Sequence, residues 1–311
     1  MRYAASRPAP LCLALVATLA LAAGLTAGGE KAGGDLEARH AQEVEAWRQD
    51  RLERLRQPDG WLSLVGLAWL EEGVNACGSD PANAVPLPAP APPRAGVFVR
   101  RGDQVTFVAA PGSAVTHQGQ PVERLPLVAD ADGAPTVLEL GTINFHVIRR
   151  GERLGVRSKD SQSPVRAAFE GIDHYPVSRE WRVEGRFEPY EPPKPVPVPN
   201  VLGTVDDELS PGAVVFAAAG RTLRLDVLEG ADEDEVFVIF GDATNGEETY
   251  GGGRFLYADL SPGGLVVLDF NRAYNPPCAF TLFATCPLPP KQNRLPLAVR
   301  AGEKKYGEGH H

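Results

Sequence analysis

The chain has 311 residues, of which 43% are hydrophobic and 23% charged, a composition typical of a globular protein with one large domain or two ordinary ones. Its 33 glycines and 29 prolines favour many turns and few long helices. The formal net charge of -9 gives no basic footprint for phosphate backbones, so nucleic acid is not expected as a partner.

The first 27 residues have the pattern of a signal peptide. Arg2 and Arg7 give a positive start, an apolar run follows over residues 11–25, and small residues place the expected cleavage within residues 22–27. The apolar run is shorter than the roughly 20 residues that span a bilayer. We therefore expect an exported protein, periplasmic or secreted, with no membrane span after cleavage. An uncleaved N-terminal anchor is the alternative.

Residues 28–58 are expected to form an amphipathic helix that packs across the body of the protein. Apolar residues recur at spacings that place them on one helical face, among many charges: Val44, Trp47, Leu52 and Leu55. The segment Pro58-Asp59-Gly60 ends this pattern.

Residues 59–163 are expected to form a β-sandwich module, because short apolar runs broken by Gly and Pro replace the helical pattern. The turn Arg101-Gly102-Asp103 is expected to join two of its strands as a hairpin. The predicted strands are 61–70, 97–101, 104–108, 136–140 and 144–149.

Residues 164–311 are expected to form a second, antiparallel β module that resembles a barrel. The Pro-rich stretch 189–195 is predicted to be an extended edge segment or strap, because proline removes backbone donors. The acidic run 232–235 is predicted to be a solvated loop. The predicted strands are 181–187, 213–218, 222–228, 235–240, 249–259, 265–270 and 279–285.

Three cysteines remain once the predicted signal peptide, with Cys12, is removed. Their odd number argues against a fully paired disulfide framework. If the run between Cys278 and Cys286 is one strand, its ends stand about 26 Å apart at roughly 3.3 Å per residue. A disulfide needs Cα atoms within about 7 Å. These two residues therefore do not pair unless the run folds back, and buried thiols facing the side of Phe280 and Leu282 are expected.

Residues 60–160 resemble the forkhead-associated family in the order and spacing of their short strand-like runs and turns. Members of that family bind phosphothreonine through an Arg after a conserved glycine and through a Ser and a His in the next loop. Here Ser79-Asp80 follows Gly78, so the resemblance implies the fold without phosphopeptide binding. We thus predict a mostly β protein: an N-terminal helix, a forkhead-associated-like β-sandwich and a C-terminal antiparallel β-barrel-like module. The matching segments are Cys77-Gly78-Ser79, Ala84-Val85-Pro86-Leu87, Gly119-Gln120-Pro121-Val122 and Leu138-Glu139-Leu140-Gly141.

The mature chain as a whole resembles the family called domain of unknown function 1684. That resemblance implies an architecture and a set of suspect residues but no mechanism. The motifs that carry it are Asp59-Gly60-Trp61-Leu62-Ser63-Leu64, Phe169-Glu170-Gly171, Phe240-Gly241-Asp242-Ala243-Thr244, Thr249-Tyr250-Gly251-Gly252-Gly253-Arg254, residues 269–278, residues 286–290, Asn293-Arg294 and Ala301-Gly302-Glu303.

The candidate ligand-binding residues are polar or reactive groups set at strand ends within apolar runs. In a barrel such ends cluster at the mouths, where pockets form. Asp242 and Arg254 are predicted to face each other as an ion pair across a hairpin turned at Asn245-Gly246. Alternatively, the Asp and Asn side chains cap turns, and the Asp242–Arg254 pair stabilises the barrel. The set is Asp242, Thr244, Tyr250, Arg254, Asp269, Asn271, Asn275, Cys278, Asn293, Arg294 and Glu303.

Three functions stay open at this stage. The first is a binding module for a small molecule or glycan of the cell envelope at the C-terminal module, with an open pocket walled by aromatic residues such as Tyr250 and Tyr274. The second is a hydrolase, using either two carboxylates of Asp242, Asp269 and Glu303 or Cys278 with His146 or His174. The third is a structural envelope protein. No cofactor or metal is expected, because standard catalytic and metal-binding motifs are missing.

Overall fold

The computed structural model describes residues 24–307, with side chains from residue 34 onward. Contacts divide the chain into a unit that ends at Gln42 and a unit that begins at Glu43. The predicted signal peptide lies outside the described residues except for its last four positions. Within the described part of the chain, no helix is both long and apolar enough to cross a membrane.

The first element is the long helix α1, Gly24–Arg56. Of its predicted stripe, Val44 and Leu55 are buried and Trp47 and Leu52 are half-buried, so the predicted packing face is confirmed. The helix ends before Pro58, which disfavours helical geometry at the residue before it. A Cβ at Gly60 would lie 2.8 Å from the carbonyl oxygen of Arg54, so this turn requires glycine.

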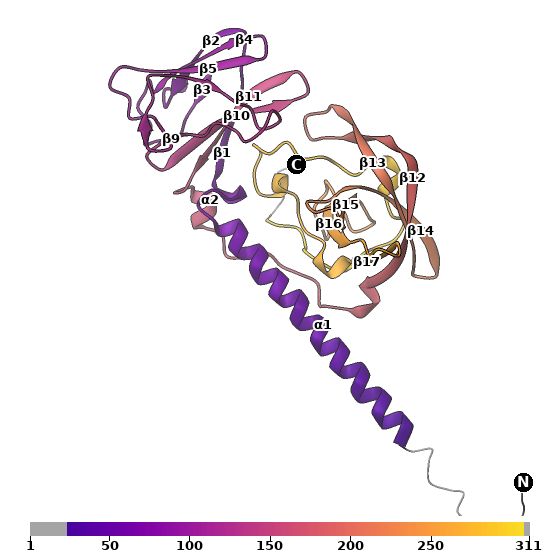
Figure 1. Ribbon diagram of the computed structural model, residues 1–311. Coiled ribbons are helices and arrows are strands. Elements are labelled where there is room, and N and C mark those ends of the chain that lie inside the picture. The colour runs from indigo at the N-terminus through magenta and orange to yellow at the C-terminus, as the bar shows by residue number, and fades with distance from the viewer. Residues whose placement is uncertain (1–23, 308–311) are drawn as a thin grey trace, which may run out of the picture. The chain divides into compact units, whose positions relative to one another are not determined.

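The chain next forms two sheets (Figure 1). One has the order β1-β11-β10-β9-β6-β7 and the other the order β3-β2-β4-β5-β8. The bounds are β1 Leu64–Trp69, β2 Gly73–Gly78, β3 Val85–Pro86, β4 Gly96–Arg101, β5 Gln104–Ala109, β6 Thr116–His117, β7 Gln120–Pro121, β8 Arg124–Leu127, β9 Leu138–Leu140, β10 Ile143–Arg150 and β11 Arg153–Asp160, preceded by the 3-10 turn η1 Trp61–Ser63.

Both sheets contribute to one hydrophobic core. Phe98 of β4, Phe107 of β5 and Phe145 of β10 pack with ring centroids 5.0 to 6.1 Å apart. The two sheets therefore form a sandwich, and the hairpin between β4 and β5 turns at Gly102 as predicted, with φ of 59°. The strands of 73–78 and 124–127 were not predicted, because their apolar residues are too few to form a pattern. Resemblance of this sandwich to the forkhead-associated family stays a prediction.

The short helix α2 (Pro164–Ala167) and the turn η2 (Arg179–Trp181) lead into a six-stranded antiparallel sheet. Its order is β16-β15-β14-β13-β12-β17, and a bridge between Leu260 and Val266 brings the two outer strands together, so the sheet is nearly closed (Figure 1). Its interior is a second apolar core. The bounds are β12 Arg182–Pro199, β13 Val205–Ala218, β14 Arg221–Glu229, β15 Glu235–Phe240, β16 Arg254–Asp259 and β17 Leu265–Asp269. The mostly β architecture with a barrel-like module is thus confirmed.

The predicted Pro-rich strap is the middle of β12. Only residues 182–186 of this strand pair with β17, whereas residues 194–199 pair with β13 alone. The stretch is therefore an extended edge, as predicted. Pro195 and Pro197 are exposed and alternate along it with the buried Val196 and Val198.

The predicted strand over 279–285 is wrong. Residues 277–279 form the 3-10 turn η4, and the chain then folds back so that the Cys278 amide donates to Cys286 Sγ at 3.1 Å. Prolines on both sides limit strand pairing, and the Thr281 hydroxyl accepts from the amide of Phe283 within the turn. Consequently Phe280 is buried while Leu282 is 60% exposed, so they do not share a face.

Beyond β17 the chain forms only the 3-10 turns η3 (Phe270–Arg272), η4 (Pro277–Ala279) and η5 (Lys291–Asn293), joined by irregular segments that reach residue 307. The predicted strand 249–259 is also shorter than expected, because residues 249–253 belong to a turn and β16 begins at Arg254.

Candidate functional site

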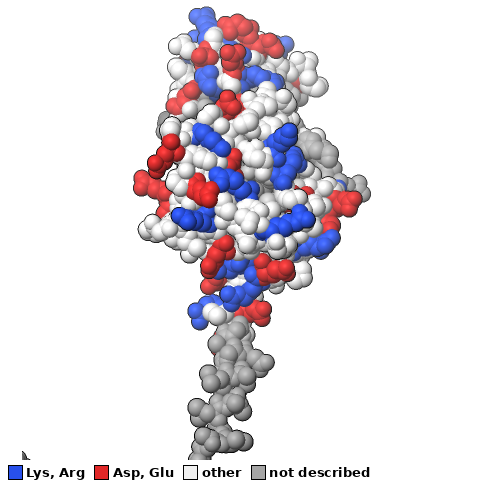
Figure 2. Space-filling view, turned by 90° about the vertical axis from the view of Figure 1, so that its right-hand side faces the viewer, with Lys and Arg blue, Asp and Glu red and all other residues white. Residues whose placement is uncertain are grey.

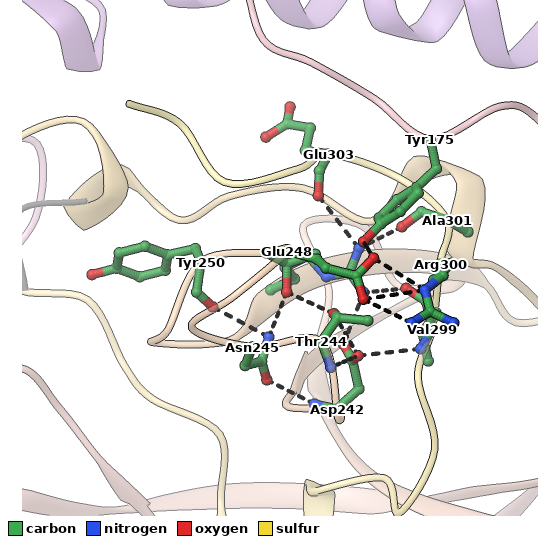
Figure 3. Close-up of polar contacts among 12 residues, drawn as sticks. Tyr175, Asp242, Thr244, Asn245, Glu248, Tyr250, Val299, Arg300, Ala301 and Glu303 are labelled. Atoms are coloured by element: carbon green, nitrogen blue, oxygen red, sulfur yellow. Dashed lines mark hydrogen bonds and ion pairs between the residues drawn. The ribbon is translucent and has the colours of Figure 1, made fainter. Parts of the chain in front are cut away.

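The ion pair predicted between Asp242 and Arg254 is confirmed. Arg254 Nη2 donates to Asp242 Oδ2 at 2.8 Å, and neither side chain is exposed to solvent. Two charges removed from water remain stable only if further hydrogen bonds satisfy them. The surrounding contacts, drawn in Figure 3, supply most of those bonds, and of the pair only Arg254 Nε is left without a partner among the described residues.

The pair ties the turn between β15 and β16 to the C-terminal segment. The Arg254 guanidinium donates to the carbonyl oxygens of Val299, at 2.8 Å, and of Ala301. Asp242 Oδ1 accepts from the amide and the hydroxyl of Thr244, at 2.8 and 2.6 Å, and from the Val299 amide at 3.2 Å. Both side chains therefore act as structural crosslinks.

The turn itself is closed by its own side chains. The Thr244 and Thr249 hydroxyls lie 2.8 Å apart, and Asn245 Nδ2 donates to Thr249 Oγ1 at 2.9 Å and to the Tyr250 carbonyl at 3.2 Å (Figure 3). Gly246, with φ of 91°, completes the reversal of the chain. Thr244 thus has a local structural partner rather than a free hydroxyl.

Glu303 and Asn275 form a second buried cluster with helix α1. Glu303 Oε1 accepts from Arg51 Nε at 2.7 Å, and Oε2 accepts from the Asn275 amide at 2.7 Å. Asn275 Nδ2 donates to the Lys304 carbonyl at 2.8 Å. Through Arg51 this cluster fixes the helix against the C-terminal segment.

The Asn293 side chain links β14 and β15 where the two strands no longer pair with each other. Strands β14 and β15 pair over only two residue pairs, and beyond them the Asn293 side chain bridges the two backbones. Its Nδ2 donates to the carbonyls of Asp226 and Ile239 at 2.8 and 2.9 Å, and its Oδ1 accepts from the Asp226 amide at 2.9 Å. Neighbouring Arg294 points its exposed side chain elsewhere and joins none of these bonds.

Asp269 and Asn271 stabilise the turn that follows β17. Asp269 caps η3 by accepting from the Asn271 amide at 3.2 Å. The Asn271 side chain exchanges two hydrogen bonds with the backbone of Ser178, at 2.8 and 2.9 Å. The predicted residues are thus distributed over several bonded clusters, and the carboxylates of Asp242, Asp269 and Glu303 each have different partners. A paired-carboxylate role for two of these residues stays a prediction.

Cys278 lies next to another cysteine and a tyrosine rather than a histidine. Hydrogen bonding from the Cys286 thiol lowers the pKa of Cys278, and Tyr250 donates its hydroxyl to the Cys278 carbonyl at 3.4 Å. His174 instead forms a backbone bridge with Glu303, and His146 lies on β10 opposite Arg157. The proposed Cys-His pair is therefore not formed.

His146 belongs to a cationic group on the outer face of β10 and β11. Burial, together with the nearby charges of Arg157 and Lys159, lowers the pKa of His146 to about 4. Burial also lowers the pKa of Arg157 to about 10. The Arg157 guanidinium donates to Thr285 Oγ1 at 3.2 Å, and Arg150 Nε donates to the same oxygen at 2.9 Å, which links the sandwich to the 279–285 loop.

Among the described residues, an open groove of about 570 Å³ lies between α1 and the outer face of β15 and β16, and it is called here the aromatic groove. This volume is in the usual range for small-molecule pockets. Half of its lining residues are aromatic, and four charged residues border it. The lining residues are Trp47, Arg51, Arg54, Leu55, Trp61, Ala231, Asp232, Glu235, Phe237, Phe255, Tyr257, Tyr274, Pro277 and Phe280.

Tyr257 and Tyr274 form the centre of this wall. Their rings stack with centroids 6.2 Å apart and planes 14° apart, and Tyr257 is 42% exposed. Trp47 lies 6.3 Å from the Tyr274 ring, and the Arg51 guanidinium lies 4.5 Å from its centroid. Tyr274 was predicted as a pocket wall. Tyr250 was predicted too, but its ring is buried on the Cys278 side and does not line the groove.

Charged side chains of both signs border the aromatic groove. Asp232 and Glu235 approach from the strand side, with Asp232 in the predicted exposed loop, and Arg54 approaches from the helix. The Arg51 charge is already balanced by Glu303, whereas the Arg54 guanidinium has no hydrogen bond or ion pair among the described residues. On the face in Figure 2, basic and acidic side chains are likewise interspersed, with no broad area of one sign.

An adjoining cavity of about 390 Å³ shares Trp47, Tyr257 and Tyr274 with the aromatic groove. Asp269 lines this cavity, as do Arg182 and Arg272 at its far side. Of the eleven candidate ligand-binding residues, only Asp269 lines one of these two cavities. The other candidates lie in the hydrogen-bonded clusters described above or beside them.

The groove residues had a signal in the sequence. Apart from Glu235, Arg254 and Asp259 at their ends, β15 and β16 are apolar or aromatic throughout. Val236, Val238 and Leu256 face the core, while Phe237 and Tyr257 pair on the other face. A strand with two apolar faces is covered on both. Among the described residues, no group of three or more His, Cys, Asp or Glu side chains is placed to hold a metal ion.

These features define a mostly β protein with a barrel-like module and a groove on its outer face. Residues 167–304 match the family described as protein of unknown function DUF1684. It is also similar to an uncharacterised protein of Haloarcula marismortui, solved by solution NMR. The two share 34% identity over 47% of this chain and 81% of that one, with a TM-score of 0.38. A search of curated proteins gave no match.

The buried ion pair predicts a large loss of stability when one charge is neutralised. Asp242→Asn leaves the Arg254 cation without its counter-charge, which we expect to lower the free energy of unfolding by about 3–5 kcal/mol. Urea unfolding followed by circular dichroism measures this. The matched control is Glu248→Gln at the solvent-exposed pair with Arg300, which we expect to move the unfolding midpoint far less. Equal midpoints for the two variants would contradict the structural role of Asp242.

The lowered pKa of His146 predicts an acid-dependent loss of stability. Between the unfolded pKa near 6.5 and the folded pKa of about 4, the unfolded chain binds a proton that the folded chain does not. Stability is therefore complete above pH 6.5 and falls as the pH approaches 4. From pH 7 to 4.5 we expect the wild type to lose about 2 kcal/mol more unfolding free energy than His146→Gln. His117→Gln, in the same module, serves as the control, and an unchanged pH dependence in His146→Gln would refute the assignment.

Proposed function

We propose that the protein is a non-catalytic binding protein that holds a glycan of the cell envelope in the aromatic groove. The observation that carries this proposal is the exposed ring of Tyr257, which stacks on the half-buried Tyr274 with the half-buried Trp47 beside it, in a groove of about 570 Å³. Pockets that bind small molecules combine such apolar walls with a few polar groups that fix orientation.

The chemistry of a sugar ring fits both parts of this wall. One face of a pyranose presents C–H groups, which pack against the flat face of an aromatic ring. Its rim presents hydroxyls that both donate and accept hydrogen bonds. The carboxylates of Asp232 and Glu235 are acceptors and the free Arg54 guanidinium is a donor, so together they match a rim of hydroxyls.

An envelope glycan is preferred as ligand because residues 1–27 have the pattern of a signal peptide. Export would bring the protein to the compartment in which such polymers are exposed. The hydrolase alternative is less favoured, because the three carboxylates have different hydrogen-bond partners and Cys278 has Cys286 and Tyr250, rather than a histidine, as neighbours. A purely structural role accounts for the buried polar residues, but not for an open groove lined by exposed aromatic rings.

The proposal predicts that glycan binding depends on Tyr257. Titration of the protein with peptidoglycan fragments and with neutral oligosaccharides, followed by calorimetry, should reveal a binding isotherm. Tyr257→Ala should weaken the affinity at least about tenfold, equal to about 1.4 kcal/mol. Quenching of Trp47 emission, absent in Trp47→Phe, should report the same event.

The matched control is Trp69→Ala, which removes a ring in contact with an arginine on the sandwich, outside the groove. This variant should bind as the wild type does. An isotherm that survives Tyr257→Ala unchanged would exclude the groove as the glycan site. No isotherm with any glycan would overturn the proposal and favour the structural role.

A further inference from the structure

A second chemical feature lies behind the groove wall, in the loop that the sequence predicted as a strand. The ends of this loop are Cys278 and Cys286, both buried and both present as free thiols. The Cys278 amide donates to Cys286 Sγ at 3.1 Å. One N–Cα bond adds about 1.5 Å, so Cys278 Cα lies within about 4.6 Å of the partner sulfur. Because a cysteine sulfur lies under about 3 Å from its own Cα, the two Cα atoms are within about 7.5 Å of each other, close to the spacing of about 4.4–6.8 Å in bridged cysteines.

The environment of the two sulfurs favours reaction at Cys278. Hydrogen bonding from the Cys286 thiol, with a further contribution from the Tyr250 hydroxyl, lowers the pKa of Cys278, and hydrogen bonding with Cys278 together with burial raises the pKa of Cys286. Cys278 is therefore the attacking sulfur and Cys286 the resolving one. Leu282, at the tip of the loop, is 60% exposed, so the loop is at the surface, where local opening admits a small reagent.

We infer that Cys278 and Cys286 form a redox-active pair that takes a small disulfide as oxidant and closes to an intramolecular disulfide. The Cys278 thiolate attacks one sulfur of the small disulfide, whose S–S bond breaks and releases a thiol. The Cys286 thiolate then attacks Cys278 Sγ in the mixed disulfide, which forms the internal bond and releases the second thiol. The two protons lost by the cysteines are carried by the two released thiols, and the small disulfide is reduced.

The new bond would act on the aromatic groove. Pro277 and Phe280, at the start of the loop, line the groove, and Phe280 packs on Tyr306 with ring centroids 4.9 Å apart. Closing the loop at residues 278 and 286 fixes the segment that carries this wall. The redox state of the pair therefore sets how rigid one side of the groove is. This inference stands on the two thiols and does not depend on the identity of the groove ligand.

The experiment counts thiols in one tryptic peptide. Cleavage at Arg272 and Lys291 releases residues 273–291, which contain both cysteines of the pair and no other. The full chain is equilibrated with reduced or oxidised glutathione, acid-quenched, unfolded, alkylated with N-ethylmaleimide and digested. In reducing buffer the peptide should carry two maleimide groups. In oxidising buffer it should carry none and weigh about 2 Da less than the free dithiol, because two hydrogens are lost.

Cys77 provides an internal control, since its thiol is buried in the sandwich without a cysteine partner and should be alkylated after either buffer. In Cys286→Ser, Cys278 should instead retain glutathione as a mixed disulfide, because the resolving sulfur is absent. The equilibration is repeated during refolding from urea, so that slow access to the folded protein cannot hide the reaction. Two maleimide groups on the peptide under every condition would overturn the inference, as would a stable glutathione adduct on the wild type.

Discussion

Residues 270–307, which follow β17, contain no strand, yet much of this segment is buried. Its backbone therefore needs hydrogen-bond partners from outside a sheet. Each buried N–H and C=O group needs a hydrogen-bond partner, which a sheet ladder would normally supply. Here side chains supply many of them. Arg254 donates to the carbonyls of Val299 and Ala301, and Glu303 accepts from the Asn275 amide. The buried polar residues of this protein are thus explained mainly as partners for irregular backbone.

One of these hydrogen-bonding side chains, Glu303, also determines where the aromatic groove lies. Glu303 is held by the C-terminal segment, and its other oxygen holds Arg51 of α1. Arg51 lies over Tyr274, whose ring stacks on Tyr257 of β16. The helix is therefore fixed beside the outer face of β15 and β16 through one continuous set of contacts. The aromatic groove is the space that this arrangement leaves open.

Much of the architecture was predictable because alternation and helical spacing are local signals. The stripe at Val44 and Leu55, the hairpin at Gly102 and the strand 235–240 followed directly from such patterns. The prediction of a strand over 279–285 was wrong, because an apolar composition with β-branched residues does not reveal whether a chain continues straight or reverses. Its reversal depends on the flanking prolines and on Thr281, whose hydroxyl accepts a hydrogen bond from the Phe283 amide.

The candidate site was predictable only in part. Polar residues at strand ends identify places where backbone needs partners, and ligand sites and structural turns share that feature. The pairing of Asp242 with Arg254 was therefore correctly predicted, whereas Tyr274 was the one predicted pocket residue that lines the aromatic groove. Recognising the groove required knowing which element covers the outer face of Phe237 and Tyr257, and that depends on long-range contacts with α1. Sequence spacing contains no information on such a contact.

The proline-rich edge of β12 has a consequence for how molecules of this protein meet one another. Along residues 195–199 the prolines alternate with valines, and the pairing with β13 uses one side of the strand only. Because proline has no N–H, the other side offers few donors to a strand from a neighbouring molecule. Edge-to-edge association into larger sheets is thereby suppressed where the barrel has its longest strand.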